Sequence, residues 1–190
     1  MNRSIIKTRI QDSIDIKSLI LGDDEIIDKI LSSARLIRSS LSSGGKVLFC
    51  GNGGSASDSL HLTAEIVGRF QKERSGLAAI SLNADVASMT AIANDYGYDT
   101  VFSRAVEGLM NPEDVIVGIS TSGNSENVYQ AILKAKEIGG KSIGLLGKTG
   151  GKIKDILDVA IVVPSDCTAR IQESHIMIGH IICELIEEDY

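Results

Sequence analysis

The chain has 190 residues, of which 43% are hydrophobic, and its formal net charge is −6. This length and composition fit one compact domain with a full core, and an acidic chain without a cluster of Lys and Arg argues against a nucleic-acid partner. No apolar stretch reaches the roughly 20 residues that span a bilayer, so a membrane partner is not expected either.

Helical and strand patterns alternate along the chain. Apolar residues repeat with the 3.6-residue period in the helical segments and form short β-branched runs in the strands. The predicted elements, in chain order, are helices at about 4–20 and 24–41, a strand at 47–50, a helix at 58–69, a strand at 77–82, helices at 86–93 and 100–110, a strand at 115–119, a helix at 126–138, a strand at 142–146, a short helix at 152–157, a strand at 159–163 and a helix at 169–187. The alternation predicts an α/β fold with a parallel sheet covered on both faces.

The helix at 4–20 has no place inside a minimal doubly wound unit. We expect this helix to pack outside the sheet, against another subunit, and we expect residues 1–43 to be N-terminal helices that make contacts within an oligomer. The whole of residues 1–190 is expected to form a single domain, because no linker or low-complexity segment interrupts the pattern.

The cysteines and the first residues bear on location. Cys50, Cys167 and Cys183 are odd in number, lie in or beside apolar segments, and lack C-x-x-C spacing, which favours reduced, buried thiols. The segment from Met1 to Leu21 mixes charged side chains with apolar ones, unlike a secretory signal peptide. A cytoplasmic protein is therefore expected.

Two loops rich in glycine and serine, Gly51 to Ser57 and Ser120 to Ser125, each follow a predicted strand and precede a helix. In an open α/β sheet this is where ligands bind, and a helix N-terminus there offers N–H groups to phosphate. Serine and threonine also cap helices, and one or two of these are expected to do so. Six turn-type residues in a row in the second loop exceed what a cap needs. The hydroxyls therefore predict a phosphate site, formed by Ser55, Ser120, Thr121, Ser122 and Ser125.

The loops also limit which phosphate is bound. The first loop contains no lysine, so it is not a P-loop. Gly51-x-Gly53-x-x-Ala56 formally matches a dinucleotide fingerprint, but that motif expects an acid about 20 residues on, at the end of the second strand. Here the second predicted strand ends near Leu82, about 30 residues from Gly51, and the acid nearest to its end is Asp85. Neutral donors at a helix N-terminus instead suit a terminal phosphate monoester.

Polar residues on apolar helices form a second candidate site. His61 and Glu65 are four residues apart and share a helix face. Gln172 and His180 can point at one site from the last helix, whereas His175 points elsewhere and is assigned a structural role. Two interpretations remain open: His61, Glu65, Gln172 and His180 hold a divalent ion such as zinc, or Glu65 and His180 act as general base and acid.

Five motifs carry a resemblance to a known family. They occur in the order Cys50-Gly-Asn-Gly-Gly-Ser55, His61-x3-Glu65-x3-Arg69, Ala93-Asn-Asp-Tyr-Gly-Tyr98, Ser120-Thr-Ser-Gly-Asn-Ser125 and Ala169-Arg-Ile-Gln-Glu-Ser-His175. From about residue 26 to its end, the chain resembles the phosphoheptose isomerases of the sugar isomerase (SIS) domain group. The resemblance implies a flavodoxin-like SIS domain, a three-layer αβα sandwich with a five-stranded parallel sheet.

The resemblance also implies an activity and its residues. The reaction would convert sedoheptulose 7-phosphate into D-glycero-D-manno-heptose 7-phosphate through an enediol, the first step toward heptose for lipopolysaccharide or capsule. Glu65 and His180 match the acid/base pair, and a homotetramer with active sites at subunit boundaries is implied. The implied zinc ligands are His61, Glu65, Gln172 and His180, and the implied substrate-binding residues are Asn52, Gly53, Gly54, Ser55, Glu65, Arg69, Asn94, Asp95, Ser120, Thr121, Ser122, Ser125 and Gln172.

Two alternatives come from the same domain group. Some of its proteins are not catalytic and bind a replication initiator, and others sense a sugar phosphate. The binders depart from the family pattern at the positions of Glu65 and His180, and this chain keeps both. The sensors usually carry an attached domain, for which this chain has no room. An enzyme is therefore the preferred prediction.

Overall fold

Five parallel strands form the centre of the molecule. The computed structural model describes residues 2–188 and 190. The strands are β1 (Val47–Gly51), β2 (Ala79–Ser81), β3 (Val115–Ser120), β4 (Lys141–Gly147) and β5 (Val159–Val163). They lie in the order β2-β1-β3-β4-β5, and every neighbouring pair is parallel. The predicted α/β class and flavodoxin-like strand order are confirmed.

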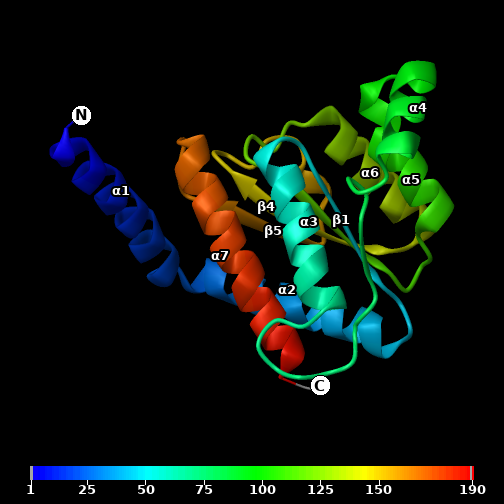
Figure 1. Ribbon diagram of the computed structural model, residues 1–190, viewed down its shortest axis with the longest axis horizontal. Helices are drawn as coiled ribbons and strands as arrows, with labels where there is room; N and C mark the ends of the chain where they lie inside the picture. The colour runs from blue at the N-terminus through cyan, green and yellow to red at the C-terminus, as the bar shows by residue number, and fades with distance from the viewer. Residues whose placement is uncertain (1, 189) are drawn as a thin grey trace.

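Helices cover both faces of this sheet and complete the three layers (Figure 1). The helices are α1 (Arg3–Leu21), α2 (Asp24–Ser42), α3 (Gly54–Val67), α4 (Val86–Tyr96), α5 (Val101–Leu109), α6 (Glu126–Ile138) and α7 (Thr168–Glu187), with short 3-10 turns η1 (Tyr98–Thr100) and η2 (Lys154–Ile156). Helices α2, α3 and α7 pack on one face, and α5 and α6 pack on the other.

The strand sequences explain the two cores. Every residue of β1 and of β3 is buried, as expected for a parallel strand covered on both faces. Side chains alternate between the faces, so Val47 and Phe49 join the core under α2, α3 and α7, whereas Leu48 and Cys50 join the core under α5 and α6. This division places α3 and α7 together on one face.

Several predicted boundaries differ from the structure, and two of them bear on the site. Helix α3 begins at Gly54 rather than near residue 58, because the chain turns at Gly53, whose φ of +57° is a conformation that only glycine adopts readily. The predicted strand at 77–82 is reduced to Ala79–Ser81. The first turn of α3 therefore belongs to the glycine loop itself.

Helix α1 extends away from the body of the molecule (Figure 1). Its only buried residue is Ile20, and its apolar side chains include exposed Ile5, Ile6, Ile10 and Ile14. Among the described residues, none of the helices combines the length and the apolar character that crossing a membrane requires.

The thiols are not all buried. Cys50 and Cys183 are buried, and burial raises the pKa of each to about 12, so both stay protonated and unreactive. Cys167 is exposed at the start of α7, which corrects the expectation of three buried thiols. It follows a turn rather than a strand or helix, and an apolar neighbourhood in the sequence does not guarantee burial there.

Candidate active site

The topological switch point of the sheet lies between β1 and β3. The chain leaves β1 toward β2 on one side and leaves β3 toward β4 on the other, which opens a crevice at the carboxyl ends of these strands. Gly51 at the end of β1 pairs in register with Ile119 of β3. The two glycine–serine loops therefore lie next to each other at the edge where ligands bind.

The first loop leads directly into α3. Gly53 occupies the N-cap position, and no side chain in the described part of the chain caps this helix. Helix α4, in contrast, is capped by Asp85. Ser55 lies in the first turn of α3 and is 3% exposed. An uncapped N-terminus offers backbone N–H groups and a positive dipole end to an anion.

The second loop joins β3 to α6. Ser120 ends the strand, and Ser125 holds the N-cap position of α6 without a capping hydrogen bond to any described residue. Instead, the Ser120 and Ser125 hydroxyls lie 2.9 Å apart and bond each other, and the Ser122 hydroxyl accepts a hydrogen bond from the Asn124 N–H at 3.2 Å. The expectation that one or two of these serines cap a helix is therefore wrong, because their hydroxyls bond within the loop.

An amide pair ties the two loops together. The Asn52 amide donates to the Asn127 carbonyl at 2.8 Å, and the Asn127 amide donates back to the Asn52 carbonyl at 2.9 Å. The Tyr98 hydroxyl donates to the same Asn52 oxygen at 2.9 Å. Asn52, predicted to contact substrate, thus also fixes the first loop against the start of α6.

The segment after β4 supports the second loop from outside. The Ile153 N–H donates to the Gly123 carbonyl at 3.0 Å, and the Lys152 N–H donates to the Asn124 side chain at 3.1 Å. Gly123 has a φ of +66°, and a Cβ there would overlap the Gly150 carbonyl. The loop therefore requires glycine at this position for both backbone conformation and space.

We expect Gly123→Ala to weaken phosphate binding about tenfold, since the clash must displace the loop by enough to lose roughly 1.4 kcal/mol of contact. Competition by inorganic phosphate against a labelled sugar phosphate measures the change. Gly44→Ala is the matched control, because Gly44 has a φ of +82° with no atom within 4 Å of its Cβ position. Equal phosphate affinity in the two variants would contradict the role given to this loop.

A cluster of titratable side chains lies between α3 and α7. The Nε2 atoms of His61 and His180 are 2.8 Å apart, and His61 Nε2 lies 3.2 Å from Glu65 Oε1. The potential ligand atoms of these three residues all lie within 4.8 Å of one another. The structure thus brings together three residues that the sequence placed on two separate helices.

Close helix packing makes this cluster possible. A Cβ at Gly179 would lie 2.6 Å from Leu62 Cδ2, and a Cβ at Gly54 would overlap the amide of Gln172. Glycines at both contacts let α7 approach α3 closely. Gln172 therefore lies against the first loop, two turns along α7 from His180.

The donor set of the cluster fits a divalent transition metal. Two imidazoles and a carboxylate on rigid helices are ligands that zinc prefers in proteins. The Nε2 atoms of His61 and His180 lie 2.8 Å apart, a contact made either when one ring donates its N–H to the other or when both rings bind the same cation. Ligation by Gln172 remains a prediction.

The other singled-out residues lie outside the cluster. Arg69 is exposed and pairs with Glu73 at 3.4 Å, and the exposed Asn94 amide donates to Asp95 at 2.9 Å. Within the described residues, no hydrogen bond or ion pair joins these side chains to the loops or the cluster. His175 is buried, and its Nε2 lies 2.9 Å from the Leu146 carbonyl oxygen. Burial lowers its pKa to about 4, which agrees with the structural role expected for it.

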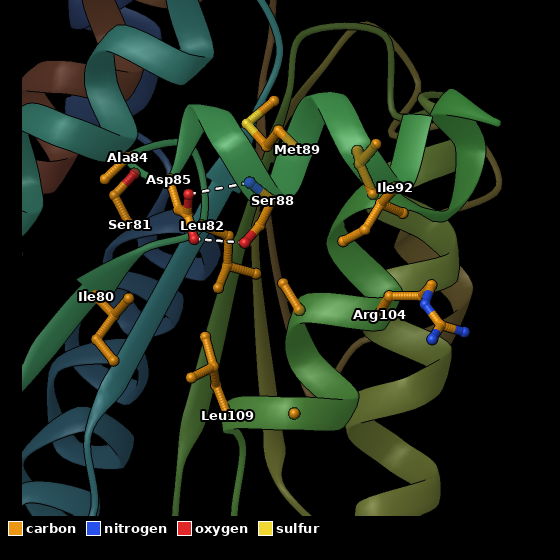
Figure 2. A pocket seen from close by; sticks show the side chains of 13 residues that line it. Ile80, Ser81, Leu82, Ala84, Asp85, Ser88, Met89, Ile92, Arg104 and Leu109 are labelled. Carbon is orange, nitrogen blue, oxygen red and sulfur yellow. Dashed lines mark hydrogen bonds between the residues drawn. The ribbon is translucent and has the colours of Figure 1, made fainter. Parts of the chain in front are cut away.

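A separate pocket of about 340 Å³ lies between β2, α4 and α5 (Figure 2). Its wall is mostly apolar, and its acid, Asp85, accepts hydrogen bonds from the Ser88 backbone N–H and hydroxyl. Arg104 stacks over the Tyr96 ring at 4.2 Å. Asp85 is thus engaged as a helix cap, which further weakens the dinucleotide interpretation, and the pocket contains none of the clustered His and Glu side chains.

Sequence reasoning missed Asn127 and Glu187. Asn127 is 2% exposed on α6 and Glu187 is 1% exposed on α7. A signal for Glu187 existed, since it follows Cys183 by four residues and so falls on the apolar face of α7. A charged residue on such a face indicates a buried partner.

The fold and the two loops define a class, the doubly wound α/β domains that hold an anion at their switch point. The family model described as "SIS domain" matches residues 19–147. The chain is 55% identical over 167 residues to a protein named phosphoheptose isomerase from Nitratiruptor sp., covering 88% of this chain and 89% of that protein.

Solved structures agree. The phosphoheptose isomerase from Neisseria gonorrhoeae superposes with a TM-score of 0.92 at 41% identity, covering 97% of this chain and 98% of that one. The enzyme from Francisella tularensis gives 0.94 at 36% identity, covering 99% and 100%. This chain belongs to the phosphoheptose isomerase family of SIS-domain proteins.

Proposed function

We propose that this enzyme converts sedoheptulose 7-phosphate into D-glycero-D-manno-heptose 7-phosphate, the first step toward heptose for lipopolysaccharide or capsule. The observation that carries the proposal is the His61, Glu65 and His180 cluster, held on the same two helices that border the first anion loop. Relatives named phosphoheptose isomerase support it. A binding-only protein would have no need of an acid, a base and an anion site together.

The loops would hold the phosphate. Backbone N–H groups at the starts of α3 and α6 supply donors without adding a charge, joined by the hydroxyls of Ser55, Ser120, Thr121, Ser122 and Ser125. We assign the sugar hydroxyls to Asn52, Gly53, Gly54, Arg69, Asn94, Asp95 and Gln172. When the remote phosphate is held in place, the reacting carbons are aligned with the catalytic groups. The binding energy of the phosphate therefore stabilises the transition state.

Glu65 and His180 would transfer the protons. A ketose becomes an aldose when one proton moves from C1 to C2 through an enediol and another moves between the two oxygens. Glu65 takes the carbon-bound proton and returns it, and His180 serves the oxygens. The proximity of both groups to His61, 2.8 Å from His180 and 3.2 Å from Glu65, supports their action on one substrate.

The same cluster would hold zinc, through His61, Glu65 and His180 with Gln172 as the fourth protein ligand. A bound zinc ion would polarise the substrate carbonyl and stabilise the developing enediolate charge.

Metal removal tests the reaction and the cofactor together. Protein stripped of metal and then resupplied with zinc is incubated with sedoheptulose 7-phosphate while the aldose is followed. We expect conversion that falls at least about tenfold on stripping and recovers with zinc. Conversion at the same rate with and without metal would contradict the proposed role of zinc but not the proposed reaction. No conversion in either state would contradict the enzyme and favour a binding protein.

Assembly and location follow from other features. We assign the row of exposed isoleucines on α1 to contacts between subunits, because a patch of this kind is costly to leave in water. A homotetramer of single-domain chains, with residues 1–43 at its interfaces, is proposed on this basis. A cytoplasmic location is proposed because Cys50, Cys167 and Cys183 are all free.

A further inference from the structure

The segment between α3 and β2, residues 68–78, has neither helix nor strand, yet one buried carboxylate holds it. The backbone N–H groups of Phe70, Gln71 and Lys72 donate to the Glu187 carboxylate at 2.7, 2.8 and 3.0 Å. Glu187 lies in the last turn of α7, and its side chain is 2% exposed. Three N–H groups around one buried anion form a nest that fixes the backbone of the segment.

Arg74 joins this nest to α3. Its Nε donates to Glu187 Oε1 at 2.9 Å, and its side chain is 4% exposed. Its terminal nitrogens donate to the carbonyls of Ile66 at 3.0 Å and Glu65 at 2.9 Å, which belong to the last turn of α3, where carbonyls lack helical partners. Arg74 and Glu187, together called the clamp, thus hold residues 70–72 and connect the ends of the two helices that carry the cluster.

The clamp also places an aromatic ring on the cluster. The ring of Phe70 stacks on the imidazole of His180, with centroids 5.2 Å apart and planes inclined by 27°. The ring of His61 also lies close to that of His180, with centroids 5.1 Å apart and planes inclined by 58°. The imidazole of His180 therefore contacts two rings, one of which belongs to the segment that Glu187 holds.

We propose that Phe70, held by the clamp, is a positioning residue that keeps the imidazole of His180 directed at His61 and Glu65. This inference rests on the proposed function. A histidine on a partly open helix face has several rotamers available, and ordering it costs conformational entropy. A stacked ring removes the rotamers that swing away, so the side chain is oriented before metal or substrate arrives.

Zinc affinity of the metal-free protein, measured by competition with a chromogenic chelator, tests the proposal. Phe70→Leu keeps an apolar side chain and removes the stacked ring. We expect about fivefold weaker zinc binding, the size of one aromatic pair, and a lower kcat with an unchanged KM, because the phosphate loops are untouched. Phe70→Tyr restores the ring and the affinity. Arg74→Lys keeps the charge beside Glu187 but not the carbonyl contacts, and should weaken zinc in the same direction.

Phe102→Leu is the matched control, since Phe102 is buried in the core on the opposite face of the sheet. Equal zinc affinities in Phe70→Leu and Phe102→Leu would overturn the positioning role of Phe70. An unchanged zinc affinity in Arg74→Lys would show that the clamp does not contribute to this positioning. If the parent binds no zinc, the zinc proposal fails. The kcat then decides: a fall in Phe70→Leu alone supports the positioning of His180, and equal kcat values overturn it.

Discussion

Glu65→Gln is expected to lower kcat about 10³-fold, the usual contribution of a positioned general base. The substitution keeps the shape of the side chain, which is 22% exposed beside His61, but an amide cannot accept the proton from C1. The phosphate loops lie at the other end of the substrate. Binding of the sugar phosphate should therefore change by less than about threefold, as expected when the interaction that is lost forms mainly in the transition state.

Two measurements separate this prediction from general damage to the enzyme. In heavy water, the parent should place deuterium at C2 of the product to the extent that the proton on Glu65 exchanges with solvent before it is returned, and Glu65→Gln should place almost none. Glu137→Gln is the control, because Glu137 is exposed and pairs with Lys134 at 2.5 Å on α6, away from the cluster. Turnover near that of the parent in Glu65→Gln would refute the assigned mechanism.

The sequence predicted the frame of the molecule because the signals for it are local. Short β-branched runs mark β1 and β3, whose residues are all buried, and periodicity marks the long helices. The start of α3 was predicted too late in the chain because Gly54 and Ser55 have poor helix propensity. That turn exists because Gly53 can adopt a positive φ, which no apolar pattern reveals.

The candidate site was predictable only in part, for a related reason. The spacing of His61 and Glu65 gives a shared helix face, but the meeting of His61 with His180 depends on how closely α7 approaches α3. That approach is set by Gly179 against Leu62. The clamp was even harder to predict from the sequence, because the donors to Glu187 are backbone N–H groups of an irregular segment. Any residue type except proline could supply these donors.

Glu187→Ala is expected to lower the free energy of unfolding by about 3–5 kcal/mol at pH 7, the cost of breaking a buried ion pair. The variant leaves the Arg74 guanidinium without its carboxylate and three backbone N–H groups without an acceptor. Urea denaturation of parent and variant measures the difference. Glu25→Gln, in an exposed pair with Lys29, is the control and should change stability by less than about 0.5 kcal/mol.

The difference between parent and Glu187→Ala should also depend on pH. Burial alone would raise the pKa of Glu187, but the N–H groups of Lys72, Phe70 and Gln71 and the charge of Arg74 outweigh it and lower that pKa from its ordinary 4.5 to about 2. A pKa depressed by folding stabilises the protein above pH 4.5, and this stability is lost as the pH falls toward 2, on the order of 3 kcal/mol in all. The stability gap should therefore be constant above about pH 5 and shrink below it. A stability gap that stays constant down to pH 3 would mean that the three N–H groups and Arg74 do not stabilise the Glu187 carboxylate.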